Sequence, residues 1–388
     1  MSQNITRRSA LVAAAAASSA AITGVASAKA SAIARALQET GGGETPKKLL
    51  MLGGTRFLGP TIVSAAVDAG WEVTLFNRGK SSPDMFEGFD KRVGDRNTGD
   101  YASLSEGEWD LCIDTSCYIP SHVTAAVEAV KGRVKHYVVV STLSVFAEDA
   151  GDDGPVDENG KISQIEPEKL PEFQVIQDVG KYGSRYYGAL KFLCEEAAKE
   201  AMPEGATTIV RPGLIVGPED GSDRFTYWPV RLAKGGEVLA PGKPETPTQY
   251  IDVRDLGVFT FDVGARGTAK TYNAVGFDRT VTMKDMIESC ILKGHGAPED
   301  LKITWVDDDF LLEQGVGQWM ELPLWIAGGG KTYSNAAAIQ DGLKFSPLAD
   351  TASATLRWFA EKRGEDHQWR AALKPEKEAK VLEAWHAR

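Results

Sequence analysis

From residue 47 onward, short apolar runs alternate with stretches in which apolar residues recur every three or four positions. The first pattern predicts β-strands and the second predicts helices. The predicted strands are 48–52, 72–76, 91–93, 110–114, 136–141 and 207–211, and the clearest helices are 61–69, 121–130 and 182–202. This alternation is typical of a parallel sheet with helices on both faces. We therefore predict an α/β fold built on a doubly wound parallel sheet.

The rhythm changes twice along the chain. Residues 147–179 are acidic and interrupted by Pro and Gly, as expected of a long functional loop rather than a linker. Beyond residue 212 the pattern becomes irregular and rich in aromatic residues. We predict a sheet domain over 47–212 and a mainly substrate-binding domain over 213–388, interleaved with the last strands of the sheet.

The first 46 residues have a different character. Arg7 and Arg8 precede an alanine-rich apolar run, and Ala26-Ser27-Ala28 supplies a small-x-small cleavage pattern. The run is too short and too rich in small residues to span a bilayer. We predict a twin-arginine signal peptide over 1–28 and a flexible tether over 29–46, hence contact with the twin-arginine export machinery and a periplasmic location. The alternative is a buried N-terminal helix.

Charge and cysteine usage narrow the class of protein. The formal net charge is −11, which argues against nucleic acid as the main partner, since phosphate binding needs a basic face. No later apolar stretch reaches membrane-spanning length. The four cysteines show no zinc-ligand spacing, so we predict structural thiols and no metal site.

A glycine-rich segment follows the first predicted strand and opens the first helix. It consists of Gly53, Gly54, Thr55, Arg56, Phe57, Leu58 and Gly59. Glycine lets the backbone turn sharply and approach a pyrophosphate, which is then bound by the amides at the helix N-terminus. The position of this loop predicts a Rossmann fold that binds a dinucleotide; the alternative is a tight turn without a ligand.

The ends of the second and third strands bear on the choice of cofactor. NAD-binding folds place a carboxylate near the end of the second strand, but Asn77 and Arg78 stand there instead. Arg78 suits a 2′-phosphate, so we favour NADP over NAD. Asp95 ends the third strand where it can receive the adenine amino group, and Arg96 next to it is also assigned to the cofactor.

The candidate catalytic residues are Tyr187 and Lys191 in the last long helix of the sheet domain. Their spacing of four places both on one helix face. A lysine ammonium beside a phenol favours the charged phenolate, so the pair can exchange a proton with a substrate hydroxyl. Ser141 and Thr142 end the fifth strand, where the ligand crevice of such sheets lies. Ser141 and Lys191 are also assigned to the cofactor.

These segments together resemble the extended and atypical short-chain dehydrogenases/reductases, the NAD-dependent epimerase/dehydratase group. The resemblance rests on the segments 53–59, 141–146, 187–191, 211–213 and 249–255 and covers the chain from residue 47 to its end. It implies catalytic roles for Thr142, Tyr187 and Lys191, and it implies that Pro212 lies in the segment that closes over the cofactor. The chain departs from the family at Arg56, which replaces a glycine, and at Phe146, which replaces the usual tyrosine.

Four residues are candidates for substrate contact in the second domain. These are Arg224, Tyr227, Trp228 and Arg231. Aromatic rings can stack on sugar faces, and arginine can bind an anionic group. Packing within the domain is an equally good explanation for them.

The expected function is that of an NAD(P)-dependent epimerase/dehydratase-like oxidoreductase acting on a sugar or glycoside. Because an exported enzyme has no maintained pool of free nucleotide, we expect a tightly held cofactor and chemistry that returns its hydride. The alternatives are an NADPH-dependent carbonyl reductase and a non-catalytic nucleotide- or polyanion-binding Rossmann protein. The loop 53–59 also resembles that of RNA-binding chloroplast proteins, which supports the last reading. Many relatives dimerise, so a homodimer is also considered.

Overall fold

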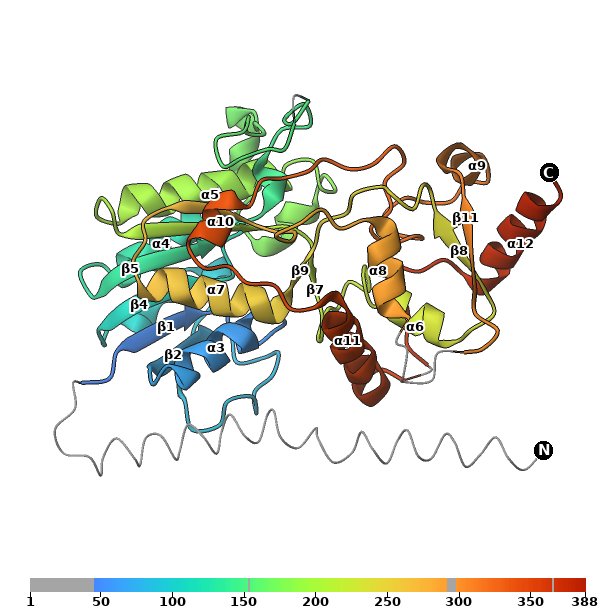
Figure 1. Cartoon of the computed structure of the whole chain (residues 1–388). Helices are drawn as coiled ribbons and strands as arrows, with labels where there is room; N and C mark the ends of the chain where they lie inside the picture. Colours follow the sequence, from blue (N-terminus) through green and yellow to red (C-terminus); the bar gives the residue numbers. More distant parts are fainter. Residues whose placement is uncertain (1–44, 153, 292–297, 365) are drawn as a thin grey trace. The chain divides into compact units, whose positions relative to one another are not determined.

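The computed structural model describes residues 45–152, 154–291, 298–364 and 366–388. The predicted signal peptide lies outside these residues, and so does the predicted tether as far as residue 44. Contacts divide the chain into two units (Figure 1). Of the described residues, unit 1 contains 45–147, 162–211 and 257–271, and unit 2 contains the others.

A seven-stranded sheet forms the centre of the fold, in the order β10-β6-β5-β4-β1-β2-β3. The strands are β1 (Lys48–Leu52), β2 (Glu72–Asn77), β3 (Asp90–Val93), β4 (Trp109–Asp114), β5 (Val134–Val140), β6 (Thr207–Pro212) and β10 (Thr271–Ala274). The neighbouring strands from β6 to β3 pair in parallel. The predicted doubly wound Rossmann sheet is confirmed, and all six predicted strands are present.

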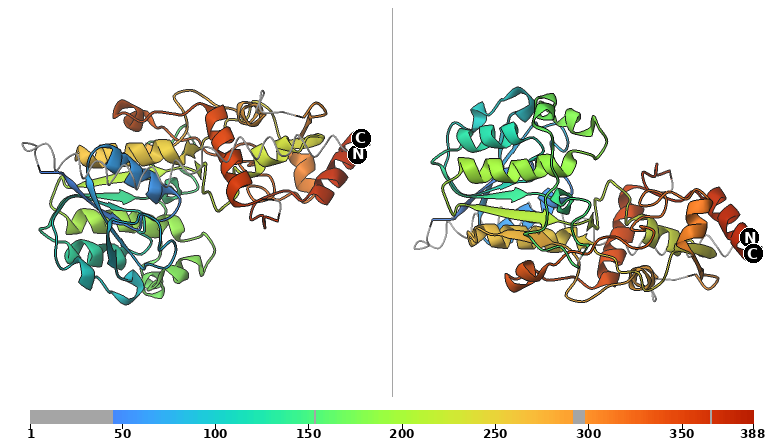
Figure 2. Two further views of the ribbon diagram at one scale, coloured as in Figure 1. Left: turned by 90° about the horizontal axis from the view of Figure 1, so that it is seen from below. Right: turned by 90° about the horizontal axis from the view of Figure 1, so that it is seen from above.

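Helices cover both faces of this sheet. The helices are α3 (Leu58–Asp68), α4 (Pro120–Ala129), α5 (Tyr187–Ala201) and α7 (Val253–Ala265). α3 and α7 lie on one face, and α4 and α5 lie on the other (Figure 2). An apolar core between the sheet and the α4–α5 layer contains Leu50, Cys112, Val123 and Cys194, all fully buried. Because β1, β4 and β5 are parallel neighbours, their carboxyl ends lie at the same edge of the sheet.

Two boundaries differ from the sequence expectation. The helix predicted from residue 182 begins only at Tyr187, because Gly183 has a φ of +62° and the preceding residues form turns. The expected long loop over 147–179 contains two short 3₁₀ helices, Pro167–Glu172 and Ile176–Gly180. Shorter 3₁₀ turns cover Arg96–Thr98, Ala102–Leu104 and Leu143–Val145.

Unit 2 is built on two small parallel sheets and several helices. The strands are β7 (Ile215–Val216) with β9 (Ile251–Asp252), and β8 (Glu237–Pro241) with β11 (Lys302–Val306). The helices are α6 (Tyr227–Ala233), α8 (Met283–Cys290), α9 (Asp308–Glu313), α10 (Ala336–Gln340), α11 (Leu348–Lys362) and α12 (Pro375–His386). Its core includes Trp228, Tyr250, Met286 and Leu311.

The four cysteines are free and buried, as predicted for structural thiols. Within the described ranges, no helix is long and apolar enough to cross a membrane. The same part of the chain contains no group of three or more His, Cys, Asp or Glu side chains arranged to hold a metal ion.

Candidate active site

The glycine-rich loop joins β1 to α3 through backbone that only small residues fit. Gly53 has a φ of +103°, and a Cβ there would lie 2.6 Å from the Thr115 Oγ1. A Cβ on Gly59 would lie 2.4 Å from the backbone of Gly54. Phe57, the N-cap of α3, has a φ of +46° and forms no side-chain cap hydrogen bond. The N-terminus of α3 therefore has no side-chain cap that would compete with an anion, although the Gly59 amide donates to the Arg56 carbonyl at 2.9 Å.

The end of β2 shapes this loop. Asn77 Nδ2 donates to the Gly53 carbonyl at 3.3 Å, and Asn77 Oδ1 accepts from the Gly79 amide at 2.8 Å. Asn77 thus joins the β2 turn to the glycine-rich loop. Arg56 and Arg78 are exposed, and the side chain of neither forms a hydrogen bond or ion pair with the described residues. Two cations are therefore available beside the loop.

The end of β3 differs from the expectation at Arg96. This residue is buried, its Nη2 lies 2.8 Å from the Asp114 Oδ2, and Tyr137 donates to the same oxygen at 2.8 Å. Burial alone would lower the pKa of Arg96, but Asp114 outweighs it and raises that pKa. The guanidinium balances Asp114 inside unit 1, which speaks against a direct cofactor contact. Asp95 is half-buried, and its Oδ1 accepts from the Asn97 amide at 3.0 Å.

Tyr187 and Lys191 lie one turn apart at the start of α5. The Lys191 Nζ donates to the carbonyls of Val140 at 2.6 Å and Cys117 at 2.7 Å, which end β5 and follow β4. Burial alone would lower the pKa of Lys191, but electrostatic interactions with Cys117 and Tyr187 outweigh it and raise that pKa. The lysine therefore stays charged at neutral pH, while Tyr187 remains half-buried beside it.

The carboxyl ends of three strands meet around this pair. Thr115 and Ser116 contact the Gly53 position, and the next residue, Cys117, binds Lys191. Thr142 follows β5 and is half-buried; its Oγ1 accepts from the Ser144 amide at 3.2 Å. The structure thus connects the glycine-rich loop, the Lys191 ammonium and the β5 end within one unit.

Gly188 fits α5 against the end of β5. A Cβ there would lie 1.8 Å from the Ser144 carbonyl oxygen, a contact with backbone that cannot move aside easily. We expect Gly188→Ala to lower the free energy of unfolding by about 1–3 kcal/mol or more, the usual cost of overpacking. Urea unfolding checks this. Gly180→Ala, where the added Cβ meets nothing within 4 Å, is the control; equal losses in both variants would contradict the packing argument.

Ser141 is held in a buried ionic cluster behind the site. Its hydroxyl donates to Glu195, and the Arg211 Nη2 donates to the Glu195 Oε2 at 2.7 Å. The Arg211 guanidinium also lies 5.1 Å from the centroid of the Phe146 ring. The Ser141 hydroxyl therefore donates within the interior of unit 1, and its assignment to the cofactor stays a prediction. Pro212, the last residue of β6, directly follows Arg211.

The candidate substrate residues of unit 2 are placed differently from the expectation. Trp228 is fully buried and donates to the Pro323 carbonyl at 2.8 Å, and Tyr227 is 3% exposed. The Arg231 Nε donates to the Glu378 Oε2 at 2.8 Å. These three side chains pack the interior of unit 2. Arg224 is half-buried, with its Nε 3.1 Å from the Ser222 Oγ.

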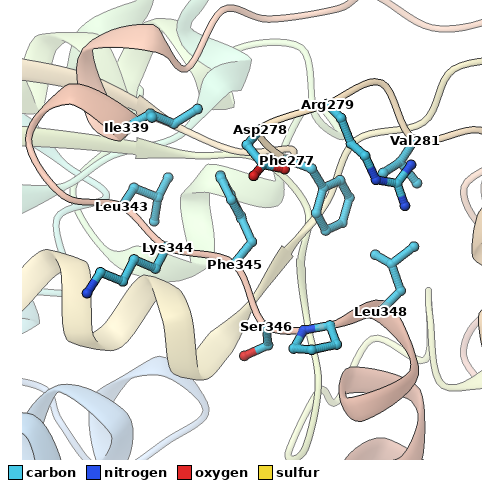
Figure 3. Close-up of a pocket in the computed structure, with 11 residues that line it drawn as sticks. Phe277, Asp278, Arg279, Val281, Ile339, Leu343, Lys344, Phe345, Ser346 and Leu348 are labelled. Atoms are coloured by element: carbon cyan, nitrogen blue, oxygen red, sulfur yellow. The ribbon is translucent and has the colours of Figure 1, made fainter.

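Unit 2 also contains a cavity of about 370 Å³ (Figure 3). Apolar side chains such as Phe277, Phe345 and Leu348 line most of it, with Arg279 and Lys344 among the polar members. None of the residues predicted from the sequence to form the site lines this cavity.

Asp220, which sequence reasoning missed, is a buried acid with an unsatisfied oxygen. The residue is 3% exposed; its Oδ1 accepts from Ser222, but its Oδ2 has no hydrogen-bond partner among the described residues. Burial raises the pKa of Asp220. Because the folded-state pKa is raised, the folded state binds this proton more tightly than the unfolded state does. The carboxyl group therefore destabilises the fold once it ionises.

We expect Asp220→Asn to raise the free energy of unfolding by about 1 kcal/mol at neutral pH, because it removes a buried charge and leaves only a neutral polar group unpaired. The gain should disappear in acid, below the ordinary carboxyl pKa, where Asp220 is protonated in both states. Urea unfolding at both pH values measures this. The control is Asp285→Asn. The Asp285 carboxylate accepts from the Thr282 amide in the capping box of α8, so this variant should be less stable than the unmodified protein at neutral pH. A gain for Asp220→Asn that persists in acid would contradict ionisation as the cause.

Comparison with known proteins extends this picture. No family model matches the chain. The chloroplast stem-loop binding protein of 41 kDa b from Arabidopsis thaliana is 26% identical over 271 residues. The match covers 65% of this chain and 64% of the relative, so it spans less than two thirds of that protein's length.

Several solved structures share the fold. The UDP-glucuronic acid 4-epimerase of Bacillus cereus, in complex with NAD, superposes with a TM-score of 0.55 at 15% identity, covering 81% of this chain and 99% of that one. The dTDP-glucose 4,6-dehydratase of Bacillus anthracis, also with NAD, gives 0.55 at 14% identity over 81% and 97%. A human epimerase family protein with NADPH gives 0.53 at 14% over 80% and 99%. The chain therefore has the fold of nicotinamide-dependent epimerases and dehydratases.

Proposed function

We propose that this chain is an NAD(P)-dependent oxidoreductase of the epimerase/dehydratase type that acts on a sugar-like hydroxyl. The observation that carries the proposal is the placement of Tyr187 beside a buried Lys191 whose ammonium is held by the ends of β4 and β5. The same β4 end contacts the glycine-rich loop. The fold shared with enzymes solved with NAD and NADPH supports the same assignment.

The residues present fit a dinucleotide. Gly53 and Gly59 let the loop pack closely against Thr115 and the Gly54 backbone in the turn that a dinucleotide-binding loop uses, and the N-terminus of α3 has no side-chain cap. The loop 53–59 would hold the pyrophosphate, and Asp95 would receive the adenine amino group. When bound, the nicotinamide supplies hydride transfer. Tyr187 takes the proton of the substrate hydroxyl, Thr142 holds the same oxygen, and the positive charge of Lys191 stabilises the ionised form of Tyr187.

A phosphate-bearing cofactor is favoured by Arg78, which is exposed and has no partner among the described residues. We expect Arg78→Ala to weaken NADPH binding about 10- to 100-fold, the value of a charge-assisted hydrogen bond, with little change for NADH. Fluorescence titration with both nucleotides measures this. Lys80→Ala is the matched control at a neighbouring exposed cation. Equal weakening of NADH and NADPH binding would contradict a contact between Arg78 and the 2′-phosphate.

The cofactor is proposed to be tightly held and exported with the folded protein. Arg7 and Arg8, together with the cleavage pattern at residues 26–28, support twin-arginine export to the periplasm. An enzyme with a captive cofactor is suited to reactions that take a hydride and return it, such as epimerisation or dehydration.

The first experiment is analysis, by mass and absorbance, of the nucleotide released by denaturing the full chain purified from the periplasm. Stoichiometric NAD(P), and its reduction on addition of UDP-glucuronic acid, dTDP-glucose, glucose or an aryl glucoside, is the expected result. An empty protein that consumes added NADPH stoichiometrically would instead indicate a carbonyl reductase. Retained nucleotide without hydride exchange on any of these compounds would indicate a non-catalytic binding protein.

A second candidate function is polyanion binding, favoured by the name of the Arabidopsis stem-loop binding protein. The net charge of −11 weighs against it. A mobility-shift titration with a stem-loop RNA at physiological salt separates the two. Tight, salt-dependent binding without hydride exchange would favour this candidate over the oxidoreductase.

A further inference from the structure

Tyr118 is a second tyrosine beside the candidate catalytic pair. It follows β4 in the segment that also provides Cys117. The Lys191 Nζ lies 5.2 Å from the centroid of the Tyr118 ring. The Tyr118 and Tyr187 rings are 6.5 Å apart with an interplanar angle of 37°. Tyr118 therefore contacts both members of the pair from outside α5.

Lys191 is a buried cation whose hydrogen bonds do not go to a carboxylate. The side chain is 3% exposed, and its donors go to the Val140 and Cys117 carbonyls and to the Cys117 Sγ at 3.4 Å. Burial raises the pKa of Cys117. A buried ammonium without a carboxylate partner needs other stabilisation. An aromatic face provides it, because the ring quadrupole attracts a desolvated cation.

We infer that Tyr118 is a positioning residue, which holds the Lys191 ammonium against Tyr187 through the face of its ring. This inference rests on the proposed function only in naming Tyr187 and Lys191 as the reacting pair. The ring, and not the hydroxyl, performs this task. The phenol itself stays neutral because burial raises the pKa of Tyr118.

Direct observation of the Lys191 ammonium tests the contact without a substrate. In protein with isotope-labelled lysine ammonium groups, the Lys191 signal is assigned by its loss in Lys191→Met. We expect Tyr118→Leu to remove the ring-current shift of the Lys191 signal and to speed exchange of the Lys191 ammonium protons about 10-fold. Tyr118→Phe should keep both the shift and the slow exchange. The control is Tyr182→Leu. In the unmodified protein, the Tyr182 ring lies 5.4 Å from the ammonium of a different lysine, Lys169. Removing this ring should therefore leave the Lys191 signal unchanged. An unchanged Lys191 signal in Tyr118→Leu would overturn the inference, and so would equal changes in Tyr118→Leu and Tyr118→Phe.

Hydride transfer on the compound identified above tests the consequence. We expect Tyr118→Leu to lower kcat about 10-fold with little change in KM, and Tyr118→Phe to restore most of the loss. The double variant Tyr118→Leu/Lys191→Met should be no slower than Lys191→Met, because Tyr118 acts through Lys191. Additive losses would show a general structural role and reject the inference. If the unmodified protein exchanges no hydride, the proposed function fails, while the ammonium signal still decides whether Tyr118 holds Lys191.

Discussion

Replacement of Tyr187 by Phe is expected to lower turnover by about 10²- to 10⁴-fold while leaving the nucleotide bound, because it removes only the group that exchanges the proton. Phe keeps the ring that packs beside Tyr118 and loses only the hydroxyl. The glycine-rich loop, which would hold the cofactor, lies in a separate segment of unit 1. Turnover is followed as hydride exchange with the captive nucleotide, and occupancy is followed as nucleotide released on denaturation.

The neighbouring residue provides the control for this prediction. Tyr186 is buried against Phe173 and Tyr182, so Tyr186→Phe removes a hydroxyl one position away without touching Lys191. It should retain turnover. Near-normal turnover in Tyr187→Phe would remove Tyr187 from the mechanism. Loss of nucleotide from Tyr187→Phe would instead indicate that its effect comes from cofactor binding.

The sheet could be predicted because buried parallel strands appear in the sequence as continuous apolar runs. β1 is the clearest example, with four buried residues in a row. β10 was missed because Thr271–Ala274 is short and lies beyond residue 212, where the apolar pattern of the sequence is irregular. The start of α5 was placed too early because tyrosine and arginine continue the helical pattern through 182–186, whereas the positive φ of Gly183 interrupts it.

The catalytic pair could be proposed from spacing alone, because residues four apart on a helix share one face wherever the helix packs. Spacing could not predict the roles of residues that depend on a partner far away in the sequence. Arg96 pairs with Asp114, and Arg231 pairs with Glu378, 147 positions away. A lone arginine in a sequence therefore indicates charge, but the fold decides whether that charge faces a ligand or another side chain.

The residues that sequence reasoning missed show how weak their signals are. Gly188 stands inside the Tyr187–Lys191 interval, and an intrahelical glycine between two catalytic candidates is a hint of close packing. Tyr118 follows a strand end, which is a position typical of site residues. Asp220 gives no sequence signal, because only the structure shows that one of its oxygens is buried without a partner.

Removal of one member of the Glu195–Arg211 pair is expected to lower the free energy of unfolding by about 3–5 kcal/mol, because it leaves the other charge buried and unpaired. Both side chains are at most 4% exposed, and Glu195 also accepts the Ser141 hydroxyl. Arg211→Met tests this in urea unfolding followed by circular dichroism. The exposed pair Lys131–Glu128 supplies the control, since Lys131→Met should cost less than about 1 kcal/mol.

The double variant Glu195→Leu/Arg211→Met separates charge pairing from packing. If the unpaired charge causes the loss, the double variant should be more stable than Arg211→Met, because neither ion remains buried alone. A double variant that loses the sum of the single losses would show that shape, not charge, holds the ends of β5 and β6 against α5. In the first case, the pairing with Arg211 is what keeps Glu195 in place as the acceptor of the Ser141 hydroxyl. Hydride exchange by a stable double variant would then show whether the Ser141 contact also positions Thr142.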